Sequence, residues 1–228
     1  MIEISSLSIS ETRDMLCAVC DEVIRRKQQL TLLDGPIGDG DHGIGMSRGM
    51  TKAKAVLLST EEGTDVSRLF YRMGRAMIGI MGGSSGVVFG TMFMAASTET
   101  GETTETNHRL TAANFSCMMR NALEKVKQRG KSKPGEKTMV DALEPAVLAM
   151  EDYVAGGGTD LTDLFHTAAE AAKQGAEATK DMLSRHGHSN TLGQRALGHP
   201  DPGAVTVSII FRAMEDYVTS YTMQSYKE

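Results

Sequence analysis

Apolar residues recur at helical spacing along nearly the whole chain, and no stretch alternates in the manner of a strand. Ser8 and Glu11 form the pattern of a capping box, which predicts the start of a first helix. Seven further apolar stripes predict seven further helices. In chain order, the eight stripes are Leu16, Cys20, Val23 and Leu30; Met46, Met50, Ala53 and Leu57; Val66, Leu69, Met73, Met77 and Ile80; the run 84–97; Phe115, Met118, Met119, Ala122, Leu123 and Val126; Val140, Leu143, Val147, Met150 and Val154; Leu161, Leu164, Phe165, Ala168, Ala172, Ala176, Thr179 and Leu183; and Val207, Ile210, Phe211, Met214, Val218 and Tyr221.

Mostly short loops between these helices favour an all-α fold, an antiparallel up-and-down bundle or closed barrel of eight helices. If the helices alternate in direction, every second loop lies at the same end. The loops at that end are the acidic turn 33–43, the glycine-rich run 82–86, the loop 130–138 and the segment 186–203. All four are polar and rich in glycine, so we expect one functional rim. The polar segment 98–107 is expected to be a surface loop elsewhere.

Length and charge limit the class of protein. With 228 residues the chain fits a single domain, residues 1–228. The net charge of −5 argues against nucleic acid or an anionic membrane surface as the main partner. No cationic segment followed by an apolar run opens the chain, and three cysteines suit a reducing compartment, so a cytoplasmic location is expected. Cys17 and Cys20 are interpreted as small core residues.

One uncharged run, 76–98, is long enough to cross a bilayer. Its centre is the sequence Gly82-Gly83-Ser84-Ser85-Gly86, which is too polar and flexible for a lone membrane span. Two buried helices joined by a glycine turn explain the run better, so no membrane contact is expected.

The acidic turn carries Asp34, Asp39 and Asp41 among glycines, followed by His42. Glycine lets the backbone fold tightly enough for three carboxylates to converge, and a converged cluster requires a cation. Oxygen ligands without a neighbouring thiol favour Mg²⁺ or Ca²⁺. An EF-hand is excluded because Met50 stands where its last glutamate belongs. Metal-bridged phosphate is the better interpretation, and a solvated acidic turn is the alternative.

The other rim loops have plausible parts of their own. Residues 82–86 offer backbone N–H groups and hydroxyls at a helix start, typical of a phosphate cradle, although close helix packing explains the glycines equally well. The loop 130–138 resembles a Walker A loop but has Glu136 where lysine is required, so its lysines are interpreted as a solvated basic loop. Asp201 before Pro202 is typical of a helix N-cap. The spacing of His186, His188 and His199 fits no usual zinc motif.

Four motifs in this order resemble the nucleotide-binding L subunit of dihydroxyacetone kinases, over nearly the whole chain. They are Leu33-Asp34 with Gly38-Asp39-x-Asp41-His42-Gly43; Gly82-Gly83-x-Ser85-Gly86; Lys137-Thr138-Met139-x-Asp141; and Gly198-His199-x-Asp201-Pro202-Gly203-Ala204. The resemblance implies an eight-helix barrel with the nucleotide, ADP or ATP, at one rim. It also implies that Asp34, Asp39 and Asp41 are the catalytic residues and hold two Mg²⁺ ions. The residues it places around phosphate, ribose or base are His42, Gly43, Ile44, Gly45, Ser84, Ser85, Gly130, Thr138, Met139, His188, Asp201, Pro202 and Gly203.

The sequence departs from that family at two of these positions. The family commonly has asparagine where Gly45 stands, and an arginine where His188 aligns. Loss of an arginine weakens phosphate recognition or the stabilisation of transition-state charge. Arg185 and Arg195 are the candidates to replace it.

The resulting hypothesis is a phosphotransferase subunit that passes a phosphoryl group to dihydroxyacetone held by a separate K-type subunit. A free-standing L chain favours resident ADP that a phosphoenolpyruvate-dependent phosphocarrier recharges, with the phosphocarrier as a second partner. The alternatives are an ATP-dependent subunit for another short ketose, such as a tetrulose, and a nucleotide-loaded regulatory module without turnover. The sequence leaves homo-oligomer formation open.

Overall fold

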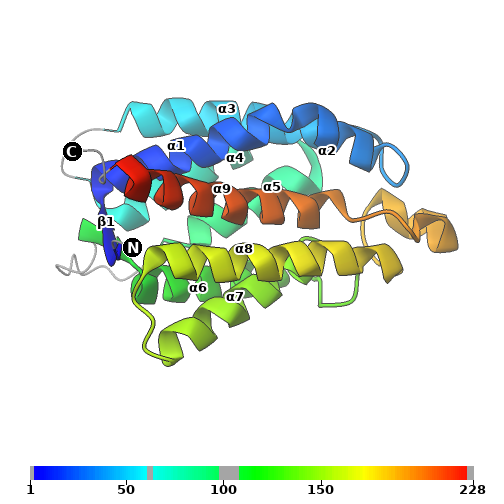
Figure 1. Ribbon diagram of the computed structural model, residues 1–228. Helices are drawn as coiled ribbons and strands as arrows, with labels where there is room; N and C mark the ends of the chain where they lie inside the picture. The colour runs from blue at the N-terminus through cyan, green and yellow to red at the C-terminus, as the bar shows by residue number, and fades with distance from the viewer. Residues whose placement is uncertain (1–2, 61–63, 98–107, 225–228) are drawn as a thin grey trace.

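The structure is a computed structural model that describes residues 3–60, 64–97 and 108–224. The predicted all-α fold is confirmed (Figure 1). Two 3-10 helices, η2 (Thr179–Asp181) and η3 (His188–Ala196), separate the last two α-helices. The α-helices are α1 (Ile9–Arg25), α2 (Lys27–Asp34), α3 (His42–Leu58), α4 (Val66–Ile80), α5 (Gly83–Ala95), α6 (Ala112–Gly130), α7 (Val140–Ala155), α8 (Leu161–Ala178) and α9 (Pro202–Gln224).

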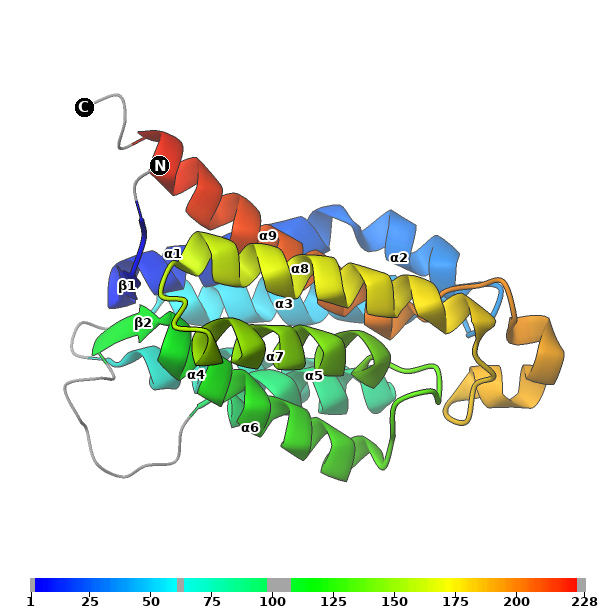
Figure 2. The same cartoon turned by 60° about the horizontal axis from the view of Figure 1, so that its bottom comes forward.

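The helices form a closed ring. From α3 onward each helix packs against the next in the chain, and α9 packs against both α8 and α1, which in turn packs against α3 (Figures 1 and 2). Because α2 continues α1, the helices of the described residues form eight helical segments around one core, as the pattern predicted. Phe70, Phe115 and Phe165 come from α4, α6 and α8 and meet inside the ring, with ring centroids 6.1 and 5.2 Å apart along the series. Cys17 and Cys20 are buried in this core, as expected.

The first predicted helix bends at Arg26, where α1 ends and α2 begins. The bend lets α2 lie very close to the start of α3. A Cβ atom added to Gly43 would lie 2.2 Å from the carbonyl oxygen of Lys27 and 2.4 Å from Oγ1 of Thr31. The apolar pattern could not show this bend, because the stripe continues through it to the buried Leu30.

The prediction that the chain has no strand is wrong in one small detail. β1 (Ser6–Ser8) pairs antiparallel with β2 (Arg109–Thr111), with Leu7 opposite Leu110. Strands of three residues are too short to show an alternating pattern. β1 leads directly into the predicted capping box of α1, in which Ser8 and Glu11 each accept a hydrogen bond from the other's backbone N–H group.

The seventh predicted helix also ends earlier than its stripe implied. α8 stops at Ala178, whereas Leu183 is 46% exposed. Thr179 ends the helix because its groups are engaged elsewhere: its hydroxyl accepts a hydrogen bond from the backbone N–H of Asp201, and its carbonyl accepts one from the Lys137 ammonium. The expected surface loop 98–107 lies outside the described residues. Among the helices described, none is long and apolar enough to cross a bilayer.

The four predicted loops do meet at one end of the ring. His42, at the start of α3, lies within hydrogen-bond distance of Ser85 in α5 and Thr206 in α9. Lys137, in the loop before α7, contacts the carbonyls of Thr179 and His199. Figure 2 shows the turn after α2, the loop before α7 and the segment between α8 and α9 at the same end of the molecule.

Candidate functional site

The three aspartates of the acidic turn converge. Asp34, Asp39 and Asp41 each offer a carboxylate oxygen, and these oxygens all lie within 4.8 Å of one another. Within the described residues this is the only group of three or more side chains that could hold a metal ion. Asp39 and Asp41 are exposed, so the group faces the outside of the rim. Three carboxylates at this separation suit a hard divalent cation such as Mg²⁺.

The backbone holds Asp34 in place against the start of α3. Asp34 is the last residue of α2, and its carbonyl accepts hydrogen bonds from the N–H groups of Ile37 and Gly38. Its carboxylate accepts a hydrogen bond from the backbone N–H of His42, at 3.2 Å. A Cβ atom on Gly38 would lie 2.0 Å from Asp34 Oδ1, so only glycine allows this turn beside the carboxylate. The positive end of the α3 dipole thus faces the acidic cluster.

His42 links three of the rim segments from a buried position. Its Nε2 lies 2.8 Å from Thr206 Oγ1, and its Nδ1 lies 3.2 Å from Ser85 Oγ. Thr206 donates its own hydroxyl hydrogen to the carbonyl of Pro202, so toward His42 it acts as the acceptor. Nε2 therefore carries the hydrogen, and Ser85 donates to Nδ1. Burial lowers the pKa of His42 to about 4, although the nearby Asp34 opposes that shift.

The glycines at the start of α5 differ in how closely they are packed. α5 begins at Gly83, and Gly82 before it supplies no side-chain cap. Around Gly82 and Gly83, an added Cβ would meet nothing within 4 Å, whereas at Gly86 it would lie 2.5 Å from Met81 Cβ. Close packing therefore explains Gly86, whereas it does not explain Gly82 and Gly83. The first N–H groups of α5 have no partner within the helix, as at any helix start.

Asp141 shapes the loop before α7. This carboxylate is buried and accepts hydrogen bonds from the backbone N–H groups of Gly135 and Thr138, at 2.5 and 2.7 Å. Met139 caps α7 directly after Thr138 and is itself buried. Asp141 was part of the Lys-Thr-Met-x-Asp motif, but the sequence offered no reason to assign it a role. The structure shows that it positions the predicted nucleotide residues Thr138 and Met139.

Lys137 is the main correction to the sequence interpretation. Instead of lying in a solvated basic loop, its side chain is 1% exposed, and its ammonium donates hydrogen bonds to the carbonyls of Thr179 and His199. Its backbone adopts a φ of 59°, which is uncommon for a residue other than glycine. Burial lowers the pKa of Lys137, while Asp201 and Asp141 oppose that shift. The other two lysines of the loop, Lys131 and Lys133, are exposed as expected.

Asp201 caps α9 as predicted and lies beside the α7 loop. Its Oδ2 accepts a hydrogen bond from the N–H of Ala204 at 2.7 Å. Burial raises the pKa of Asp201 to about 7, against the opposing influence of the Ala204 hydrogen bond and Lys137. A Cβ on Gly203 would lie 3.0 Å from Asp201 Oδ2 and 3.4 Å from Met139 Cβ. The start of α9 therefore packs directly against the start of α7.

The remaining predicted residues fall on the same rim. Gly43, Ile44 and Gly45 occupy the first turn of α3, where Ile44 is 43% exposed and the nearest atom to a Cβ on Gly45 would be Met81 Cε, 4.0 Å away. Gly130 ends α6 at a point where a Cβ would lie 3.6 Å from Val88 of α5. His188 begins η3 in the segment between α8 and α9. His186 pairs with Glu136 rather than with another histidine.

The fold and this rim together define an all-α protein with a cluster of three carboxylates at one end of a closed ring. The DAK2 domain family matches residues 36–216, and the chain belongs to this family. It is 38% identical over 194 residues to the ADP-binding subunit DhaL of PEP-dependent dihydroxyacetone kinase 1 of Listeria innocua, covering 85% of this chain and 89% of that subunit.

Two further comparisons are with longer proteins. The chain is 35% identical over 209 residues to the L-erythrulose kinase of Pectobacterium atrosepticum, covering 91% of this chain but 34% of that enzyme. The crystal structure of the dihydroxyacetone kinase from C. freundii in complex with AMP-PNP and Mg²⁺ has a TM-score of 0.67 and 25% identity. That match covers 90% of this chain and 33% of the kinase chain, so this chain spans about a third of each.

Proposed function

We propose that this chain is the nucleotide- and Mg²⁺-binding subunit of a dihydroxyacetone kinase. In this function it works with a separate K-type subunit that holds the ketose. The observation that carries the proposal is the convergence of Asp34, Asp39 and Asp41 within 4.8 Å, beside the starts of α3 and α5. The similarity to an ADP-binding subunit over 85% of the chain supports the same function.

The donor set fits the cation. Asp34, Asp39 and Asp41 would hold Mg²⁺, which prefers carboxylate oxygens together with the phosphates of a substrate. By family resemblance two ions would share these carboxylates. When bound, Mg²⁺ neutralises charge on the phosphate oxygens, which is the main electrostatic requirement of phosphoryl transfer.

The chain's own groups would orient the nucleotide around this point. The N–H groups of Ser84 and Ser85 at the start of α5 would donate to phosphate oxygens, and the α5 dipole would favour the negative charge. Thr138 and Met139, held by Asp141, would line the ribose or base, together with Gly130. The segment from Asp201 to Gly203 would close the site against Met139. Catalysis of this kind depends on positioning and on electrostatic complementarity.

The phosphoryl donor follows from the same similarity. The L. innocua relative is named PEP-dependent and ADP-binding. We therefore infer that ADP stays resident here and is recharged by a phosphocarrier that draws on phosphoenolpyruvate, in the cytoplasm. A second candidate is an ATP-dependent subunit for a tetrulose, which the 35% identity to an L-erythrulose kinase favours.

Mass spectrometry of the denatured, purified protein separates the two donors. Stoichiometric ADP with Mg²⁺ would support the resident cofactor, whereas an empty protein that binds ATP only with Mg²⁺ would support the second candidate. Isothermal titration then tests the site itself. Asp39→Asn should abolish Mg²⁺-dependent nucleotide binding, and Asp152→Asn, an exposed aspartate on α7, should not. Equal affinity in both variants would refute the metal site.

Turnover is tested by adding a K-type subunit with dihydroxyacetone or L-erythrulose, and either ATP or a phosphoenolpyruvate-driven phosphocarrier. We expect dihydroxyacetone phosphate to form when phosphoenolpyruvate, delivered through its phosphocarrier, is the only phosphoryl donor. Tight nucleotide binding without sugar phosphate under any of these conditions would favour the regulatory module instead.

A further inference from the structure

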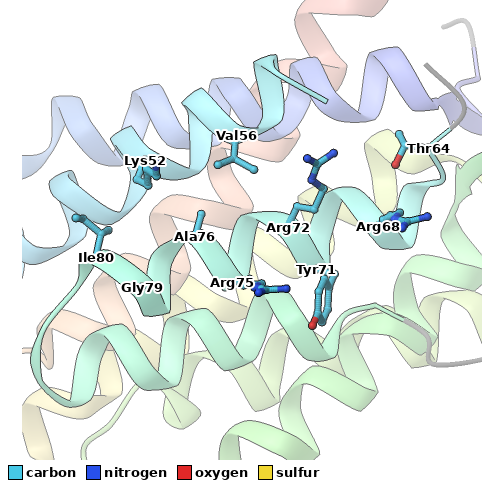
Figure 3. Close-up of a pocket in the computed structure, with 10 residues that line it drawn as sticks. All are labelled: Lys52, Val56, Thr64, Arg68, Tyr71, Arg72, Arg75, Ala76, Gly79 and Ile80. Carbon is cyan, nitrogen blue, oxygen red and sulfur yellow. The ribbon is translucent and has the colours of Figure 1, made fainter. Parts of the chain in front are cut away.

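A basic groove runs along the outer wall of the ring. It has a volume of about 800 Å³ and lies on α4, with one edge formed by α3. Figure 3 shows Lys52 on α3 and Arg68, Arg72 and Arg75 on α4 around it. The nucleotide site proposed above uses none of these residues.

The positive charge of the groove is uncompensated within the part of the chain that the structure describes. Among the described residues that line it, none has an acidic side chain. None of the ion pairs formed by described residues involves Lys52, Arg68, Arg72 or Arg75. The nearby Asp65 carboxylate accepts the backbone N–H of Arg68 as the cap of α4. This concentration of positive charge stands on a chain whose net charge is −5.

The three arginines follow one another at intervals of about one helical turn. Like charges three or four residues apart on a helix repel one another, so an external anion would stabilise this face. A guanidinium group binds a carboxylate through two parallel hydrogen bonds, which gives direction as well as attraction. A row of carboxylates with the same one-turn spacing would match the row of arginines.

The length and the apolar content of the groove favour a polypeptide over a small metabolite. From Arg68 to Ile80 the wall extends about 18 Å, at 1.5 Å per residue. Tyr71 and Ile80 line it and are 36% and 41% exposed, and tyrosine and arginine are enriched at protein interfaces. One phosphorylated molecule would engage only part of this length.

Gly79 shapes one end of this groove. It is the last but one residue of α4 and adds no side chain to the lining. Internal packing does not explain it, because an added Cβ would meet nothing within 4 Å. The missing side chain leaves the α4 backbone open to the groove.

We propose that this groove is the docking site of a partner protein that presents an amphipathic helix with carboxylates one turn apart. A helix that binds in a groove presents its contact residues at positions i, i+3 or i+4 and i+7. Carboxylates with this spacing could pair with Arg68, Arg72 and Arg75, which are spaced in the same way along α4. Opposite charges on the two surfaces speed the encounter and set the register. None of the residues that line the groove is assigned to the proposed nucleotide site.

The test uses a fluorescein-labelled helical peptide with glutamate at positions i, i+4 and i+7 and leucine on the same face. Anisotropy is measured with the intact protein at low and at physiological salt. Arg72→Gln/Arg75→Gln should weaken binding by about tenfold or more and reduce its salt dependence. Lys125→Gln/Lys173→Gln removes the same charge from two exposed sites elsewhere and should leave binding unchanged.

Gly79→Leu distinguishes a shaped groove from general attraction between charges. It fills the open space without altering charge, so binding of the peptide should fall while helical circular dichroism and affinity for Mg²⁺-nucleotide stay the same. Undiminished binding to Gly79→Leu would overturn the proposal, as would equal losses in the two charge variants. If inorganic tripolyphosphate binds the groove and the glutamate peptide does not, the site takes small anions and the proposal also fails.

Discussion

The buried ammonium of Lys137 donates a hydrogen bond to the backbone carbonyl of Thr179, 42 residues further along the chain. A second hydrogen bond reaches the carbonyl of His199. One side chain thus ties the loop before α7 to both ends of the segment that joins α8 to α9. The Lys137 ammonium also lies near the carboxylate of Asp201, which caps the start of α9.

Replacing this lysine should therefore loosen the rim as well as lower stability. Lys137→Met leaves the buried carbonyl of Thr179 and the partly buried carbonyl of His199 without their donor, and it removes the positive charge near Asp201. We expect the free energy of unfolding to fall by about 2–4 kcal/mol, since each buried group left unsatisfied costs about 1–3 kcal/mol. Urea unfolding measures this loss, and titration calorimetry should show weaker binding of Mg²⁺-ADP.

Lys133→Met is the matched control, because Lys133 is exposed in the same loop. It should change both quantities little. If the two variants are equally stable, the hydrogen bonds of Lys137 do not contribute to folding as the structure indicates.

The protonation of Asp201 predicts a pH dependence of stability. Burial raises the pKa of Asp201 from 3.8 to about 7, so the folded chain holds this proton more tightly than the unfolded chain. The contribution of Asp201 to stability is then largest below about pH 4 and falls as the pH rises to 7. Asp201→Asn should abolish that fall, which is measured as the difference between the urea midpoints of the two proteins from pH 4 to pH 8.

The effect of Asp201 must be taken from the difference between variants, because the titration of His42 changes stability with pH in the opposite direction. Its pKa is lowered to about 4 by burial, so its contribution to stability rises with pH over an overlapping range. Asp152→Asn, which removes an exposed carboxylate, should keep the profile of the parent protein. If the stability of Asp201→Asn varies with pH in the same way as that of the parent, the carboxylate of Asp201 is hydrated and its pKa is not raised.

The fold was largely predictable because the apolar stripes of these helices are long and regular. What they could not show was the bend at Arg26, since the stripe continues to Leu30 on the same face. The early end of α8 was also hidden, because it depends on hydrogen bonds that Thr179 makes to Lys137 and Asp201. Contacts between residues so distant in sequence leave no local pattern.

In the candidate site, too, the sequence showed what a local pattern carries and did not show contacts between distant residues. The acidic cluster was visible because three aspartates lie within eight residues among glycines. Lys137 was misread, since a lysine in a loop of lysines gives no sign of burial. Thr206, which accepts the hydrogen bond of His42, lies 164 residues from it in sequence and occupies one position in an ordinary helix. The assignment of ligand roles to these residues stays a prediction, as does the single-domain boundary 1–228.

The hydrogen bonds of His42 predict which tautomer the neutral ring adopts. Thr206 acts as acceptor toward Nε2, so the hydrogen should reside there, and the low pKa should keep the ring neutral at pH 6. Nitrogen-15 NMR of the histidine rings reports this directly. Thr206→Val should cost about 1–3 kcal/mol by leaving the buried N–H without an acceptor, whereas Thr206→Ser should retain the tautomer. A charged ring or the Nδ1–H form at pH 6 would contradict the network.

The departure from the family at Gly45 gives the last prediction. Family members commonly have asparagine there, and the structure leaves space for it, because the nearest atom to an added Cβ is Met81 Cε at 4.0 Å. Gly45→Asn should keep or slightly raise stability, since asparagine suits a helix better than glycine by a few tenths of a kcal/mol. Its amide would add a donor beside the acidic cluster and the start of α5. We therefore expect several-fold tighter binding of Mg²⁺-nucleotide by titration calorimetry.

Gly49→Asn, one turn further along α3, provides the contrast. A Cβ there would lie 2.2 Å from Met81 Sδ, so this variant should lose stability without any gain in affinity. The two variants separate a vacant position at the rim from a glycine that packing requires. Unchanged nucleotide affinity in a stable Gly45→Asn protein would mean that the amide does not reach the phosphates. The departure at Gly45 would then be neutral, and any weakness of phosphate binding would have to be sought in the segment that carries His188.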